Sequence, residues 1–175
     1  WNRQSLQQVS VRGMETEIKI VVLDRSSVGE DVSVAPVEKY GEVVLYSNTV
    51  AADASERVKD ADSIVVNKTP MNETTLSGAS RVRLICEFAT GFDNIDLDYC
   101  RSRGITVGNV RNYSTAVVAQ HTFAMALYLL EKLRYYDDYV KNGVYASQSS
   151  FSHFGMTFGE LEGKTWGIVG MGNIG

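Results

Sequence analysis

The last six residues carry the glycine spacing of a turn that binds a dinucleotide. Gly170, Gly172 and Gly175 follow an apolar run, Trp166 to Val169, for which we predict a β-strand. In such a turn the first glycine permits a tight bend, the second lets a pyrophosphate approach the backbone, and the third lets the next helix pack on the strand. Glycine-rich turns also occur in hairpins and plain loops. The spacing alone therefore leaves a nucleotide site and an ordinary turn both open.

A second candidate is the polar segment Asn67-Lys68-Thr69. It follows an apolar run and could present an amide, an ammonium and a hydroxyl group to an anionic ligand. The alternative is an ordinary loop ahead of Pro70, in which the Asn and Thr side chains satisfy backbone groups of their own loop. The residue types do not decide between these two interpretations.

A third candidate is the segment 89–93, Ala-Thr-Gly-Phe-Asp. Its backbone N–H groups could form a concave nest that accepts a carboxylate. The alternative is a turn that leads into a helix. Asp93 or Asp96 is expected to cap that helix under either interpretation, because a carboxylate at this position accepts hydrogen bonds from the first helical N–H groups.

Few other side chains suit catalysis or metal binding. The chain has two histidines. His121 lies on the apolar face of an expected helix, which favours a structural role, and His153 lies between two phenylalanines, where a surface position is expected. Cys86 and Cys100 lack a Cys-x-x-Cys spacing, so we predict buried free thiols in a reducing compartment. No carboxylate cluster indicates a metal site.

Asp24, directly after the first expected strand, invites comparison with a phospho-acceptor aspartate. A receiver domain would also want an aspartate at the end of its third strand, where this chain has Asn67. We therefore do not favour a receiver domain.

The length and composition of the chain limit the kind of protein that can carry these candidate site residues. With 175 residues, of which 44% are hydrophobic, the chain can form one domain and at most part of another. A net charge of −4 gives no basic surface for nucleic acid. No apolar run approaches the roughly 20 residues of a membrane span. We expect a cytoplasmic protein.

Short apolar runs alternate with helix-like stretches along the first two thirds of the chain. Strands are expected at 17–23, 42–46, 62–66, 84–86 and 105–107, with helices at 34–40, 53–60 and 96–103. This alternation requires βαβ crossovers and a parallel sheet. We predict an α/β fold, a flavodoxin-like five-stranded parallel sheet over residues 14–112. Ligands bind at the carboxyl ends of such strands, where the segments 67–70 and 89–93 are expected.

The longest helical pattern follows, from residue 114 to about residue 140. Apolar residues recur there at i, i+3 and i+4, and one helix of this length would extend about 40 Å, enough to link two domains. We assign residues 113–162 to a linking helix and its connector, and residues 163–175 to the start of a Rossmann domain with its first strand. Residues 1–13 are polar and are expected to be an added tail ahead of a native start at Met14.

In this order the motifs resemble the N-terminal part of the NAD-dependent D-isomer-specific 2-hydroxyacid dehydrogenases, over residues 14–175. The runs that carry the resemblance are Ala89–Asp96, Arg103–Val107, Val117–Thr122 and Glu160–Thr165, ahead of the glycine turn. The Ala89-Thr90-Gly91 sequence, Gln120 and the Asn67-Lys68-Thr69 loop are similar to the glycerate dehydrogenase (hydroxypyruvate reductase) branch.

The resemblance implies an oxidoreductase that transfers a hydride between NAD(H) and a small D-2-hydroxy or 2-keto acid. It implies that the substrate carboxylate is bound by Asn67, Lys68, Ala89, Thr90 and Gly91, and the NAD pyrophosphate by Gly170, Gly172, Asn173, Ile174 and Gly175. It also implies a homodimer formed through residues 114–160. The family's catalytic Arg, Glu and His lie beyond its glycine turn, so we expect no catalytic residue in this chain and no activity from the chain alone. The alternative is a non-catalytic flavodoxin-like module for ligand binding or dimerisation.

Overall fold

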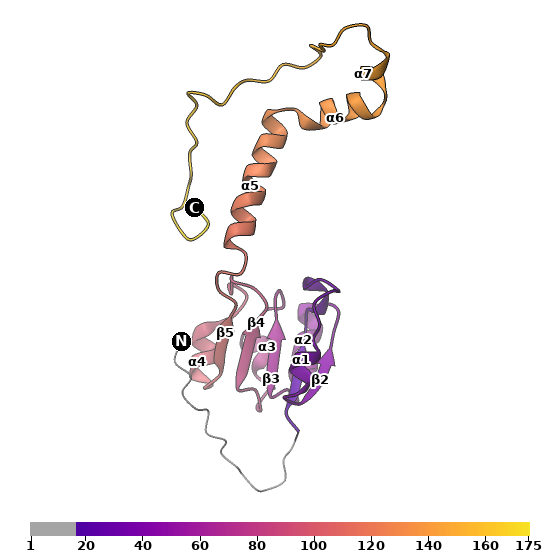
Figure 1. Ribbon diagram of the computed structural model, residues 1–175. Coiled ribbons are helices and arrows are strands. Elements are labelled where there is room, and N and C mark those ends of the chain that lie inside the picture. The colour runs from indigo at the N-terminus through magenta and orange to yellow at the C-terminus, as the bar shows by residue number, and fades with distance from the viewer. Residues whose placement is uncertain (1–16) are drawn as a thin grey trace. The chain divides into compact units, whose positions relative to one another are not determined.

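The structure is a computed structural model that describes residues 17–175 (Figure 1). It consists of two compact units, the first ending at Arg111 and the second comprising Asn112–Gly175. The first unit contains a sheet with flanking helices, and the second contains helices followed by an extended segment.

The first unit is built on five parallel strands. They are β1 Lys19–Val22, β2 Glu42–Leu45, β3 Ser63–Val66, β4 Leu84–Glu87 and β5 Thr106–Asn109. Their order in the sheet is β2-β1-β3-β4-β5, which is the flavodoxin-like order. The predicted fold class is therefore confirmed. All strand bounds fall within two residues of the predicted ones, and β5 extends two residues beyond its predicted end, to Asn109.

Short helices connect these strands. A 3₁₀ turn, η1 Arg25–Ser27, follows β1, and the α-helices are α1 Ala35–Glu38, α2 Ala51–Val58, α3 Glu73–Leu76 and α4 Leu97–Ser102. Helix α3, which is four residues long, was not predicted. Asn72 and Asp96 cap α3 and α4 by accepting hydrogen bonds from the backbone N–H groups of Thr75 and Tyr99. Asp96, and not Asp93, is thus the capping aspartate.

One face of the sheet forms the main core of the first unit. Alternate residues of the strands point to this face, and they pack against apolar residues of α2, α3 and α4, such as Val58, Leu76 and Cys100. The sheet residues in this core include Val21, Leu23, Ile64, Val66 and Ile85.

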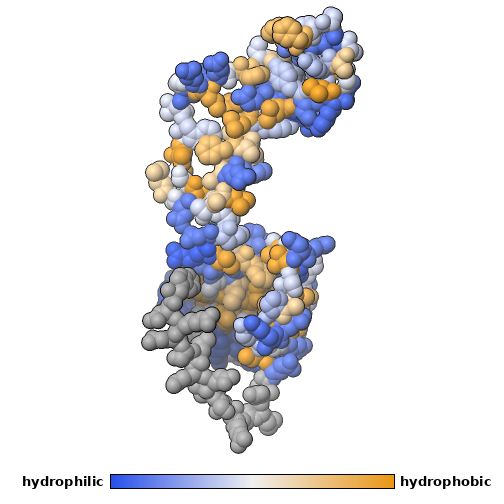
Figure 2. All heavy atoms as spheres, in the orientation of Figure 1, coloured by the Kyte–Doolittle hydropathy of each residue, from blue (hydrophilic) through white to orange (hydrophobic). Residues whose placement is uncertain are grey.

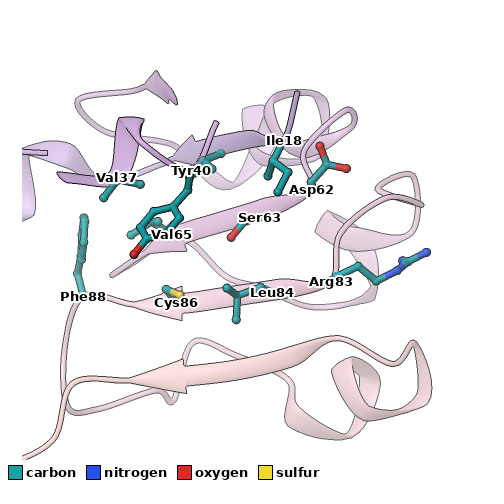
Figure 3. A pocket seen from close by; sticks show the side chains of 11 residues that line it. Ile18, Val37, Tyr40, Asp62, Ser63, Val65, Arg83, Leu84, Cys86 and Phe88 are labelled. Atoms are coloured by element: carbon teal, nitrogen blue, oxygen red, sulfur yellow. The ribbon is translucent and has the colours of Figure 1, made fainter. Parts of the chain in front are cut away.

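The opposite face is only partly covered. Val37 of α1 packs against a small cluster of Ile20, Val22 and Val65, and beside it lies an open groove of about 750 Å³ (Figure 3). Leu84, Cys86 and Phe88 line the groove from β4 and its end. Figure 2 shows apolar side chains gathered on the surface of this unit. This exposure is unusual, because a parallel sheet is normally covered on both faces.

The second unit differs from the prediction of one long helix over 114–140. It contains α5 Thr115–Leu130, α6 Leu133–Lys141 and α7 Val144–Ser147, the last of which lies in the expected connector. Lys132 has a left-handed backbone, with φ 54°, and this residue ends the helical path between α5 and α6. No residue of α5 is buried, so His121 is exposed and the predicted structural role for it is wrong.

The predicted strand at the end of the chain is not formed. Residues 165–169 have no regular secondary structure, because a strand needs a neighbouring strand to accept and donate its backbone hydrogen bonds. Trp166 nevertheless packs on α5, where its ring stacks on that of Phe123 with centroids 4.9 Å apart. Val169 is fully exposed.

An aromatic cluster packs the segment around His153 against helix α6. The ring of His153 stacks on Tyr139 with centroids 3.7 Å apart, and its Nε2 atom lies 2.7 Å from the hydroxyl of Tyr135. His153 is therefore half-buried and structural, where we expected a surface position. Across residues 17–175 we find no helix whose length and apolar character would suffice to cross a membrane.

Candidate carboxylate-binding site

Asp24 organises the loop that follows β3. Its Oδ2 atom accepts hydrogen bonds from the backbone N–H groups of Asn67, Lys68 and Thr69, at 2.9, 2.9 and 3.1 Å. The Thr69 hydroxyl donates to Oδ1 at 3.0 Å. Both Asp24 and Thr69 are buried. The loop is thus wrapped around one carboxylate, which belongs to the neighbouring strand β1.

This arrangement decides which groups of the loop remain for a ligand. The backbone N–H groups of residues 67–69 all donate to Asp24 and are not available to a ligand. Within this loop, an external anion can therefore be bound only by the side chains of Asn67 and Lys68. Lys68 is exposed, and Asn67 is half-buried with its Oδ1 atom enclosed and without a hydrogen-bond partner in the described part of the chain. Thr69 faces inward and is a structural residue.

The loop that follows β4 presents free backbone donors. The carbonyl of Ala89 accepts from the N–H of Val110 at 3.0 Å, and the Thr90 hydroxyl donates to the carbonyl of Val110 at 2.8 Å. These bonds fix the loop to the end of β5 through its acceptors and its hydroxyl. Within residues 17–175, nothing accepts a hydrogen bond from the N–H groups of Ala89, Thr90 or Gly91. Thr90 and Gly91 are exposed and Ala89 is half-buried, so these N–H groups are candidates for binding a ligand.

The two loops lie at the same edge of the sheet and are tied together. Met71 donates its N–H to the carbonyl of Asn94 at 2.8 Å, and the N–H of Asp96 donates to the carbonyl of Met71 at 2.8 Å. The side-chain Nδ2 of Asn94 donates to the carbonyl of Thr69 and to Oε2 of Glu87, each at 3.2 Å. Asn94 thereby links the segment 67–71 to the end of β4.

Two buried carboxyl groups beneath these loops have opposite pKa shifts. Burial alone would raise the pKa of Asp24, but the hydrogen bonds from residues 67–69 outweigh it and lower that pKa. Burial raises the pKa of Glu87 from 4.5 to about 7, against the weaker opposing effects of the Asn94 hydrogen bond and the Lys68 charge. Asp24 is therefore an anion at neutral pH, whereas Glu87 is divided between its two protonation states.

The sequence did not indicate Asp24, Glu87 or Asn94 as site residues. The residues around Asp24 suggest only the comparison with a phospho-acceptor, because its hydrogen bonds to residues 67–69 depend on β1 lying next to β3 in the sheet. Glu87 had a signal too, since it lies two residues after Ile85 and shares its buried face. The predicted residues Asn67, Lys68, Ala89, Thr90 and Gly91 are brought together at the carboxyl ends of β3 and β4.

The glycine turn lies in the second unit and is exposed. Gly170 has φ 107°, a conformation open to glycine, and a Cβ atom added to Gly175 would lie 2.2 Å from the carbonyl oxygen of Gly170. Asn173 donates from Nδ2 to Oδ1 of Asn112 at 2.6 Å. A Cβ atom added to Gly172 would meet nothing within 4 Å, so the shape of the turn itself requires glycine only at Gly170 and Gly175.

Other candidate residues do not join a site. Cys100 is buried and Cys86 is half-buried, and both are free. Burial raises the pKa of both thiols, which makes them poor nucleophiles. Among residues 17–175 no three His, Cys, Asp or Glu side chains are grouped so that they could hold a metal ion.

Comparison with known proteins identifies the fold's relatives. The model of the D-isomer specific 2-hydroxyacid dehydrogenase catalytic domain matches residues 20–162. A hydroxypyruvate reductase of Blautia hydrogenotrophica is 32% identical over 162 residues, which are 90% of this chain and 50% of that protein. A glycerate dehydrogenase of Methylorubrum extorquens is 32% identical over 158 residues, with the same coverage.

Solved structures agree with this assignment. The crystal structure of D-lactate dehydrogenase from Aquifex aeolicus, complexed with NAD and lactic acid, matches with a TM-score of 0.69 and 34% identity, over 90% of this chain and 45% of that one. The chain thus spans about half the length of the relatives that it matches. Because the family model covers most of the chain, this protein belongs to the D-isomer-specific 2-hydroxyacid dehydrogenase family.

Proposed function

We propose that this chain provides the substrate-binding part of an oxidoreductase that transfers a hydride between NAD(H) and a small D-2-hydroxy or 2-keto acid. Glycerate and hydroxypyruvate are the favoured pair, because the names of two similar proteins include them. The observation that carries the proposal is the set of open N–H groups at Ala89, Thr90 and Gly91, next to the loop of Lys68 at the carboxyl edge of the sheet.

Each residue has a distinct role in this proposal. The N–H groups of residues 89–91 and the ammonium of Lys68 bind the substrate carboxylate, and the Asn67 side chain orients a neighbouring oxygen. A charge-assisted hydrogen bond contributes about 1.5–3 kcal/mol, and association costs several kcal/mol in lost freedom. Two or three such bonds therefore support only weak binding, with a Kd in the millimolar range.

NAD supplies the hydride chemistry when it is bound, and the protein supplies orientation and electrostatics. Gly170, Gly172, Asn173, Ile174 and Gly175 are proposed to contact its pyrophosphate. Micromolar affinity requires about 8 kcal/mol, more than a few amide contacts can provide against the cost of association. We expect the 175-residue chain by itself to show neither measurable NADH binding nor oxidation of NADH with hydroxypyruvate at 340 nm.

The proposal includes a homodimer formed through residues 114–160 and a reducing, cytoplasmic compartment. Apolar side chains of α5, such as Phe123, Met125 and Leu129, are more than half exposed, and a second copy could cover them. A reducing compartment would keep Cys86 and Cys100 as thiols.

A titration followed by NMR tests substrate binding directly. D-glycerate added to the ¹⁵N-labelled chain should shift the amide signals of Ala89, Thr90 and Gly91, and Lys68→Met should weaken binding about tenfold, the loss of one charge-assisted contact. Lys59→Met, an exposed lysine at the end of α2, is the matched control and should bind like the parent chain. Unchanged signals at residues 89–91 up to 100 millimolar glycerate, on the order of a hundred times a millimolar Kd, would refute the proposed site.

A non-catalytic module for ligand binding or dimerisation is the second candidate. It is favoured by the first unit having a complete five-stranded sheet with its own core. The reading frame beyond codon 175 distinguishes the two. A continuing helix and a strand that ends in Asp or Glu support the oxidoreductase, since that carboxylate would bind the cofactor ribose.

A further inference from the structure

Glu87 occupies a position at which the strand pattern calls for an apolar residue. It lies two residues after Ile85 on β4, so the two side chains share the sheet face that α2, α3 and α4 cover. The Glu87 side chain is 1% exposed. An ionised carboxylate in this position loses most of its hydration, which is unfavourable unless protein groups replace the lost water.

The contacts of Glu87 replace that water only in part. Oε2 accepts one hydrogen bond, from Nδ2 of Asn94 at 3.2 Å. Oε1 is buried and has no hydrogen-bond partner in the described part of the chain. Because the same Nδ2 also donates to the carbonyl of Thr69, Glu87 holds the amide that joins the two carboxylate-binding loops.

The charges of two nearby residues, Lys68 and Asp24, change the pKa of Glu87. Lys68, on the loop after β3, favours the ionised form, and Asp24, at the end of β1, opposes it. The nearby acids on the other loop, Asp93 and Asp96, are exposed to solvent. Burial outweighs the Lys68 charge, so that the pKa of Glu87 is about 7.

We propose that Glu87 is a positioning residue for the carboxylate-binding loops, and that its protonation sets the affinity of the site for a small 2-hydroxy carboxylate. This inference rests on the proposed function. Neutral Glu87 leaves Lys68 free for the ligand, while Oε2 still accepts the hydrogen bond from Asn94. Ionised Glu87 attracts Lys68 and adds a negative charge beneath the ligand carboxylate. Affinity therefore falls as the pH rises through 7.

The test is a titration of the ¹⁵N-labelled 175-residue chain with D-glycerate between pH 6 and 8.5. We expect the Kd of the parent chain to rise about fivefold over this range, as for one added like charge close to the site. Glu87→Gln, which fixes the neutral state, should show a constant Kd, and Glu42→Gln, an exposed glutamate on the edge strand β2, should behave like the parent chain.

If Glu87→Gln folds poorly, a second measurement, which needs only the parent chain, tests the same proposal. The ¹³C signal of the Glu87 carboxyl should titrate near pH 7, and saturating glycerate should raise that midpoint, because coupling between proton and ligand is reciprocal. A constant Kd in the parent chain, or an unmoved midpoint, would overturn the role of Glu87 while leaving the carboxylate site intact. Absence of glycerate binding at every pH would instead reject the proposed function, and this inference with it.

Discussion

Asp24 and Thr69 meet at two points, because the aspartate accepts both the backbone N–H of Thr69, at 3.1 Å, and its hydroxyl, at 3.0 Å. Both residues are buried, and they lie on segments separated by 45 positions in the chain. The pair fixes the start of the loop after β3 to the end of β1. The loop therefore has its shape before any ligand arrives.

Replacing Asp24 should destabilise the first unit markedly. In Asp24→Asn the negative charge is lost, and a single neutral carbonyl oxygen remains to accept the hydrogen bonds from Asn67, Lys68 and Thr69. We expect a loss of about 2–4 kcal/mol in urea unfolding at pH 7, since several bonds to a buried charge are weakened together. Asp98→Asn is the control, because that side chain is 92% exposed and the change should stay within about 0.5 kcal/mol. Equal stabilities of the two variants would contradict the role of Asp24.

Glu87 should make the first unit less stable as the pH rises from about 4.5 to about 7. Its folded pKa lies above its ordinary value, so the native state binds more protons in this window and stability falls with pH. The shift from 4.5 to about 7 corresponds to about 3 kcal/mol as an upper estimate. Asp24 has the opposite sign, and its contribution is lost only at more acidic pH, as its lowered pKa is approached.

Urea unfolding of the parent chain and of Glu87→Gln, compared at pH 5 and pH 8, isolates this effect. The free energy of unfolding of the parent chain, minus that of the variant, should be smaller at pH 8 than at pH 5. A difference that stays constant, or grows with pH, would show that Glu87 ionises normally in the folded chain.

The fold of the first unit could be read from the sequence because each strand is a short apolar run bounded by polar residues. β3, for example, is the run Ser63–Val66 followed by Asn67 and Lys68. The candidate loops were predicted for the same reason, since strand ends define the binding edge of a parallel sheet. The hydrogen bonds that fix these loops were not predictable, because the bonds of Asp24 depend on which strands are neighbours in the sheet.

The second unit was predicted less well, for two physical reasons. Lys132 adopts a left-handed backbone although its neighbours favour a helix, and nothing in the local sequence demands that turn. Residues 165–169 have the composition of a strand, but strand formation depends on partners elsewhere in a sheet.

The two faces of the sheet should respond differently to truncation of adjacent residues on β4. Ile85 is fully buried in the main core, so Ile85→Ala should lower the free energy of unfolding by about 2–4 kcal/mol. Leu84 borders the open groove and is 37% exposed, so Leu84→Ala should lower it by less than about 1 kcal/mol. Urea unfolding of both variants at one pH provides the comparison. A similar loss in both would mean that another surface covers the groove in solution.

The stack of Trp166 on Phe123 gives the second unit a fluorescent reporter. The two ring centroids are 4.9 Å apart with an interplanar angle of 25°, a geometry that contributes about 0.5–1.5 kcal/mol. In a Trp1→Phe background Trp166 is the sole tryptophan. Phe123→Ala should then shift its emission to longer wavelength and raise acrylamide quenching about twofold, because one face of the indole ring becomes exposed to water.

Phe154→Ala is the matched control, since that ring is 90% exposed and makes no ring contact within residues 17–175. Its emission and quenching should equal those of the Trp1→Phe chain. If Phe123→Ala and Phe154→Ala quench alike, Trp166 does not rest on α5 in solution. The segment that leads into the glycine turn would then lack the one aromatic contact that attaches it to the helix, and its strand would form only upon pairing with another strand.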